Sequence, residues 1–113
     1  MPVTVKRMYE PAAKSDGYRI LVDRLWPRGI KKEAAAIDQW LKEIAPSTEL
    51  RTWYHKDKTQ WTEFKKRYKA ELKDNPALDE LKQLSKKHKH ITLLYSVKDE
   101  EHNHALILAE FLQ

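Results

Sequence analysis

The sequence predicts a small α/β domain of three layers, in which a short, mostly parallel sheet of about three strands is covered by four to five helices. Three short apolar segments rich in β-branched residues alternate with longer segments in which apolar residues recur every three or four positions. Strands separated by helical patterns are typical of a parallel sheet with helices packed over it. The length of 113 residues suits one core, so we expect residues 1–113 to form a single domain.

The three expected strands differ in how apolar their two faces are. Val3 to Tyr9 alternates only in part, whereas Tyr18 to Leu25 contains a run, Ile20 to Val22, that is apolar on both faces. Such a run is typical of a strand covered on both sides, which places the second strand in the centre of the sheet. Ile91 to Val97 is the third strand. If it runs parallel to the second strand, both end at the same edge of the sheet.

Five helices are expected between and after these strands. Alanines and an apolar stripe predict the first, Ala45-Pro46 ends it, and Ser47 is placed to cap the second. Asn75 followed by Pro76 is a start signal for the fourth, with asparagine as the cap and proline in the first turn. The expected helices are Glu33 to Ile44, Thr48 to about Tyr54, Gln60 to Lys73 capped by Thr59, a helix from Pro76, and Ala105 to Leu112.

The composition limits the kinds of function that this chain can have. It has no cysteine, which excludes disulfides, thiolate zinc sites and cysteine nucleophiles. No segment has the apolar length of a signal peptide or a membrane span, so we expect a cytoplasmic protein that does not associate with membranes. There are 22 Lys and Arg residues against 17 Asp and Glu residues, and the formal charge of +5 favours encounters with anions.

Charged residues directly follow the apolar part of the second strand, where burial does not explain them. Ligands of open α/β sheets bind outside the carboxyl ends of the strands, so this position predicts a site. Asp23 could act as a general base, and Arg24 and Arg28 could hold a carboxylate or phosphate through paired hydrogen bonds. The alternative is an internal salt bridge between Asp23 and an arginine that braces the turn, with Trp26 simply packed.

A second polar cluster follows the third strand. The imidazole of His102 or His104 is the natural group for proton transfer, because its ordinary pKa lies near neutrality. The alternative is structural: Asp99 caps the last helix and His104 forms hydrogen bonds within the fold. We predict that Asp23 and His104 would carry any catalysis. The residues expected to bind a ligand beside them are Arg24, Trp26, Arg28, Trp53, Tyr54, Tyr95, Ser96, Lys98 and Asn103.

Two further binding functions are compatible with the sequence. The helix over residues 60–73 carries Lys65, Lys66 and Arg67 near aromatic side chains, a pattern found on surfaces that bind nucleic acid. This non-enzymatic module is the alternative to the pocket. His-x-His pairs at residues 88/90 and 102/104 could ligate zinc, but spacing alone is weak evidence, so no metal site is predicted. The chain has only two glycines, so a glycine-rich nucleotide cradle is not expected, and neither is a cofactor.

The string Asp23-Arg24-Leu25-Trp26-Pro27-Arg28-Gly29 resembles the signature of the YeaO-like bacterial proteins, part of the group called domain of unknown function 488. Ala45-Pro46-Ser47, Leu93-Leu94-Tyr95 and His102-Asn103-His104-Ala105 match in the same order, so the resemblance covers nearly the whole chain. It implies a small cytoplasmic bacterial α/β domain. The shared positions that it implies are Asp23, Arg24, Pro27 and Arg28 after one strand and the Asn103-His104 turn after another.

One departure from the wider group affects the expected chemistry. In much of that group a cysteine ends the late strand and a Cys-His-Arg triplet follows, whereas here those positions are Tyr95 and Asn103-His104-Ala105. Only the histidine is retained, so a thiol-dependent activity is not implied for this chain. We therefore expect a pocket for a small anion, phosphate or carboxylate, at the strand ends, with proton transfer as its candidate chemistry.

Overall fold

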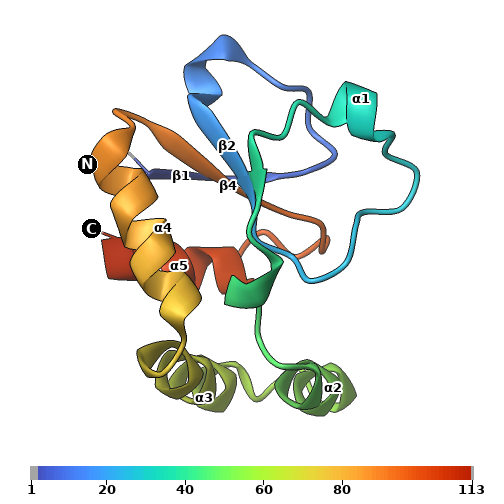
Figure 1. The fold of residues 1–113 in the computed structure, drawn as a ribbon. Helices are drawn as coiled ribbons and strands as arrows, with labels where there is room; N and C mark the ends of the chain where they lie inside the picture. Colours follow the sequence, from blue (N-terminus) through green and yellow to red (C-terminus); the bar gives the residue numbers. More distant parts are fainter. Residues whose placement is uncertain (1–2, 113) are drawn as a thin grey trace.

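The computed structural model describes residues 3–112 and contains a four-stranded, fully parallel sheet with helices packed against it (Figure 1). The strands are β1 (Val3–Arg7), β2 (Tyr18–Leu21), β3 (Gln39–Trp40) and β4 (Ile91–Tyr95), in the order β1-β4-β2-β3. The predicted α/β class is confirmed, with four strands in place of about three.

The central strand β4 organises the sheet, because it is apolar on both faces and every one of its residues is buried. It pairs with β1 up to Arg7↔Tyr95 and with β2 up to Leu21↔Leu94. Beyond Leu21 the ladder continues for one further hydrogen bond, from Val22 N to Leu94 O (3.0 Å). Strands β2 and β4 are therefore shorter than predicted, and their carboxyl ends, with that of β1, meet at one edge.

Four of the predicted helices are present. They are α2 (Thr48–Lys56), α3 (Trp61–Lys73), α4 (Pro76–Lys87) and α5 (His104–Leu112). Ser47 Oγ accepts a hydrogen bond from Leu50 N and caps α2, and Asn75 caps α4, as predicted. Thr59 does not cap α3, because its hydroxyl donates to Asp57 instead. Within residues 3–112, no helix combines the length and the apolar character needed to cross a bilayer.

The helix predicted over Glu33–Ile44 is wrong. In its place the structure has a single helical turn, α1 (Lys32–Ala35), then the edge strand β3 and a 3-10 turn (Lys42–Ile44). The apolar spacing of this segment fits a helix, but the segment lies beside β2 and extends the sheet by one strand. Local pattern and tertiary pairing therefore disagree here, and pairing decides the structure.

The physical reason lies in the backbone of β2. Helix α1 ends because Ala36 has a left-handed conformation (φ 52°), which turns the chain back along β2. There Asp38 accepts a hydrogen bond from Arg19 N (2.8 Å), and Leu41 N donates to Leu21 O (2.9 Å). The backbone groups of β2 need partners on this side, and an isolated helix could not supply them.

Two apolar cores lie on opposite faces of the sheet, as the alternation of side chains along a strand requires. Ile20 and Leu93 face the larger core, which β2 and β4 form with α2 to α5. Leu21 and Leu94 face the smaller core. Packed against the smaller core are Trp26, Ile30, Ile37 and Trp40, so the chain between β2 and β3 covers this face.

Gly17 precedes β2 and provides a test of this arrangement. Its φ is +68°, and a Cβ there would lie 2.3 Å from His90 O, the acceptor that bonds Tyr18 N at 2.9 Å. We expect Gly17→Ala to lower the free energy of unfolding by at least about 2 kcal/mol, because strain and a backbone clash add. Urea denaturation measures this change.

Gly29 is the matched control. It also has a positive φ (+78°), but a Cβ there would have no neighbour within 4 Å. Gly29→Ala should therefore cost only the conformational part, about 1 kcal/mol. Equal losses in the two variants would contradict the close packing of Gly17 against His90.

Candidate functional site

A cavity of about 610 Å³ opens at the carboxyl ends of β2 and β4. Loops that follow these strands form part of its wall, and α2, the start of α3 and the start of α5 form the rest. The cavity lies where parallel α/β sheets usually bind ligands. Nine predicted site residues line it, namely Asp23, Arg24, Trp26, Arg28, Tyr54, Ser96, Lys98, Asn103 and His104.

The carboxylate of Asp23 joins the ends of β2 and β4. Its Oδ2 accepts hydrogen bonds from Ser96 N (2.9 Å) and Ser96 Oγ (2.6 Å), and the residue is only 9% exposed. Its Oδ1 lies 3.2 Å from His104 Nε2. The predicted alternative, a salt bridge from Asp23 to an arginine, is therefore not what the structure contains.

The ring of His104 is held in one orientation by the start of α5 and the end of β2. Its Nε2 bonds Val22 O at 2.8 Å, so the contact with Asp23 Oδ1 is electrostatic and not a second full hydrogen bond. Both groups facing Nε2 are oxygen acceptors, so this nitrogen carries the proton. Among residues 3–112, Nδ1 has no hydrogen-bond partner, and it is the nitrogen available for proton exchange.

The electrostatics of Asp23 change its expected role. Burial raises the pKa of the Asp23 carboxyl, but the close contact and charge of His104 and the hydrogen bonds from Ser96 outweigh burial and lower the pKa from 3.8. Asp23 is therefore ionised at neutral pH and is a weak base. Its place 3.2 Å from Nε2 suits it to orient the ring of His104, as carboxylates commonly orient histidines.

Arg24 lies beside Asp23 without pairing to it. Its Nη2 donates to Ala45 O (3.2 Å) and Pro46 O (3.4 Å), which fixes the guanidinium against the start of α2. Its Nε is buried and has no acceptor within residues 3–112. Since buried donors are nearly always satisfied, this arginine has spare binding capacity. Arg28, by contrast, is exposed at the mouth of the cavity.

Three cationic or titratable side chains of the wall were not predicted. Arg51 and His55 lie on α2, and Lys58 follows it. Partial burial, together with the charges of Lys58 and Arg51, lowers the pKa of His55. Residues 51 and 55 are four positions apart, so helical spacing could have shown that they share a face of α2, whereas Lys58 lies beyond the end of the helix.

Trp53 and Tyr95 do not line the cavity, which corrects two predicted site residues. Trp53 lies about 200° around α2 from Arg51, because each residue of a helix turns the chain by about 100°. It packs instead under the guanidinium of Arg67, 4.1 Å from its ring centroid. Tyr95 shares the β4 face of Leu93 and is buried in the larger core.

The four histidines of the two His-x-His pairs have separate partners. Across residues 3–112, no three His, Asp or Glu side chains are gathered so as to hold a metal ion. His88 stacks on Tyr18, and His90 Nε2 is 2.7 Å from Thr4 Oγ1. His102 Nδ1 contacts Asp99, whose carboxylate also accepts hydrogen bonds from the backbone N of Glu101 and of His102.

Asn103, between the two histidines of the second pair, caps the last helix. Its Oδ1 accepts a hydrogen bond from Leu106 N in the first turn of α5.

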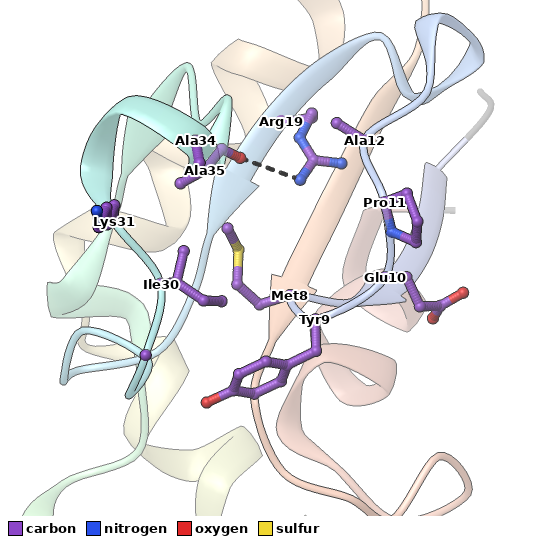
Figure 2. A pocket seen from close by; sticks show the side chains of 11 residues that line it. Met8, Tyr9, Glu10, Pro11, Ala12, Arg19, Ile30, Lys31, Ala34 and Ala35 are labelled. Atoms are coloured by element: carbon purple, nitrogen blue, oxygen red, sulfur yellow. Dashed lines mark hydrogen bonds between the residues drawn. The ribbon is translucent and has the colours of Figure 1, made fainter.

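A second cavity of about 400 Å³ lies on the other side of β2 (Figure 2). Figure 2 shows Arg19 extending from β2 toward α1, where it donates to Ala35 O (3.3 Å). Its Nε donates to Ala36 O and its Nη1 to Asp16, so all three nitrogens of the buried guanidinium have protein partners. This arginine braces the loop against β2, so its guanidinium is not available to a ligand in the cavity beside it.

The lowered pKa of Asp23 predicts how the free energy of unfolding depends on pH. A carboxylate whose pKa falls on folding stabilises the native state above its unfolded pKa, here 3.8, and loses that contribution as pH falls through the folded pKa. At neutral pH we expect Asp23→Asn to cost about 2 kcal/mol of unfolding free energy. Urea denaturation should show this difference shrinking once the pH falls below 3.8.

The exposed Asp74, at the end of α3, supplies the matched control. Asp74→Asn also removes one carboxylate, but at an exposed position, and should change stability by less than about 0.5 kcal/mol at any pH. A gap between wild type and Asp23→Asn that stays constant down to strongly acidic pH would contradict the lowered pKa of Asp23.

Comparison with known proteins adds the family. A family model described as the inactive DUF488-N3 subclade matches residues 2–113. The chain is 51% identical over 114 residues to the uncharacterized protein YeaO of Escherichia coli, covering 100% of this chain and 98% of the relative. It is 42% identical over 110 residues to the uncharacterized protein Rv3073c of Mycobacterium tuberculosis and likewise to Mb3100c of Mycobacterium bovis, covering 97% of this chain and 92% of each relative.

No solved structure gives a significant match to the chain. The family match extends over both strand ends that form the cavity, including the Asp23 to Gly29 string and the Asn103-His104 turn. The chain therefore belongs to the DUF488 family, in the branch described as the inactive DUF488-N3 subclade, with YeaO of Escherichia coli among its relatives.

Proposed function

We propose that the cavity at the ends of β2 and β4 binds a small anion through a phosphate or carboxylate group. One observation carries this proposal. Five Lys and Arg side chains line the cavity, and among residues 3–112 none of them forms an ion pair. They are Arg24, Arg28, Arg51, Lys58 and Lys98.

Unpaired cations around one cavity repel each other, and an anion at their centre removes that repulsion. The two acidic residues of the wall do not neutralise them, because Asp23 is committed to Ser96 and His104, and Asp99 to its own turn. Guanidinium groups bind oxyanions through two parallel hydrogen bonds.

The family description supports binding more than catalysis. The matching subclade is described as inactive, and this chain has no cysteine. His104 is held in place by the bond from its Nε2 to Val22 O, and its Nδ1, which has no protein partner within residues 3–112, is the nitrogen that can accept a proton. If the protein has a residual activity, we propose that His104 moves the proton and Asp23 keeps its ring in place.

The nucleic-acid alternative is not favoured by the contacts of α3. Lys65 and Lys69 both lie near Glu110, and Arg67 pairs with Glu63 while it covers the ring of Trp53. These pairs reduce the charge that the helix presents to a phosphate backbone. Titration with DNA and RNA tests this alternative directly.

The anion proposal is tested by titrating the protein with inorganic phosphate at low ionic strength, followed by backbone amide NMR and calorimetry. We expect saturable binding with shifts at residues of the cavity. Arg28→Gln should weaken it by at least about tenfold, because one charge-assisted hydrogen bond is worth about 1.5–3 kcal/mol. Arg28 is exposed, so this variant should fold normally.

Lys66→Gln on α3 is the control, since it removes the same charge at an exposed position outside the cavity. Equal weakening by both variants would mean that only net charge matters, and no saturable binding would exclude the proposal. Duplex and single-stranded DNA and RNA are titrated in parallel. Salt-dependent binding that Lys66→Gln weakens would favour the nucleic-acid alternative.

A further inference from the structure

We infer that the anion bound in this cavity is an aromatic one, a carboxylate or phosphate group attached to a planar ring. This inference rests on the proposed function and narrows its ligand class. It follows from apolar side chains that line the cavity and that an inorganic anion does not require. They occur at its mouth and on its inner wall.

The mouth of the cavity carries the exposed apolar residues. Among residues 3–112, the large hydrophobic side chains left exposed are Tyr9 (46%), Leu25 (65%) and Val97 (40%), and all three line this cavity. They come from three different segments, which follow β1, β2 and β4. An apolar patch rimmed by charges is characteristic of a binding surface and is uncommon elsewhere on a monomer.

The inner wall is aromatic and already assembled. Tyr54 of α2 and Trp61 at the start of α3 line the cavity, with ring centroids 6.0 Å apart. Phe64 supports both, at 4.5 Å from Tyr54 and 5.6 Å from Trp61. A ligand ring would therefore meet a preformed surface of rings, and aromatic pairs gain stabilisation beyond the area that they bury.

Charge and apolar surface alternate along both loops that frame the mouth. Arg24 and Arg28 flank Leu25 on one loop, and Lys98 follows Val97 on the other. A ligand whose anionic group binds these cations would place its apolar part against Leu25 and Val97. The volume of about 610 Å³ lies within the usual range of sites for small organic molecules, about 300–1,000 Å³, which a bare oxyanion would leave mostly empty.

We infer an aromatic and not an aliphatic ligand because the cavity is lined by aromatic rings and guanidinium groups. Rings stack on rings, and guanidinium groups also stack on aromatic faces. Arg24 and Arg51 both line the cavity that Tyr54 and Trp61 enter, so the same groups can bind the charge and contact the face of a planar ligand.

The test compares matched anions by calorimetry and by NMR of the full chain. Phenyl phosphate should bind at least about tenfold more tightly than inorganic phosphate, and benzoate more tightly than acetate by a similar factor, because each ring is buried against the wall. Benzoate should also bind several-fold more tightly than cyclohexanecarboxylate, which has the same charge and a saturated ring.

Two variants locate the ring. Leu25→Ala, at an exposed position, and Tyr54→Leu should each reduce the affinity for phenyl phosphate about three- to tenfold and leave that for inorganic phosphate unchanged. Trp53→Leu is the matched control, because Trp53 lies on the same helix but outside the cavity. It should change neither affinity.

The possible outcomes separate the anion-binding proposal from the inference that the anion is aromatic. Inorganic phosphate binding as tightly as phenyl phosphate would overturn the aromatic ligand and leave the anion-binding proposal standing. Equal binding of benzoate and cyclohexanecarboxylate would overturn the preference for a planar ring. Ring-dependent binding that Leu25→Ala and Tyr54→Leu leave unchanged would place it elsewhere on the protein. Absence of binding by all of these anions would exclude both proposals.

Discussion

The contacts of the Asp23 carboxylate hold together the elements from which the cavity is built. Ser96 donates to this carboxylate with both its backbone N and its hydroxyl, which ties the chain after β4 to the chain after β2. His104 lies 3.2 Å from the other oxygen and bonds Val22 O, which adds the start of α5. Three segments far apart in sequence therefore meet at one buried charge. A buried charge is tolerated only with such partners, so the partners and the fold depend on each other.

The commitment of Asp23 explains why the cations around it are free. In many proteins, adjacent Asp and Arg residues pair with each other, and the site then has no charge to offer. Here Arg24 turns instead to the carbonyl oxygens of Ala45 and Pro46, and its Nε stays without an acceptor within residues 3–112. The geometry separates the acidic group, which is structural, from the basic ones, which face the cavity. That separation is what makes an anion site chemically reasonable.

The positions at which the resemblance implied cysteines in the wider group have structural contacts of their own in this chain. Tyr95 is buried in the larger core, where its neighbours on the same strand face also lie. Asn103 accepts from Leu106 N and donates to Asp99 O, which orders the start of α5. His104 is the member of this cluster that both lines the cavity and keeps a nitrogen free of protein partners within residues 3–112. This chain, which matches a branch described as inactive, therefore has a shaped and charged pocket.

The sequence by itself determined the α/β class, the caps of α2 and α4, and the place of the cavity, because apolar runs, capping residues and strand ends are local signals. Only the tertiary structure decided that residues 39–40 form an edge strand, since the unpaired backbone of β2 outweighed a helical pattern. It also turned Trp53 away from the cavity and brought Arg51 and Lys58 to it, because the direction of a side chain depends on how its helix packs. The partners of Asp23 could likewise not be predicted from the local sequence. Ser96 and His104 reach it only because β2 and β4 run in parallel and end together.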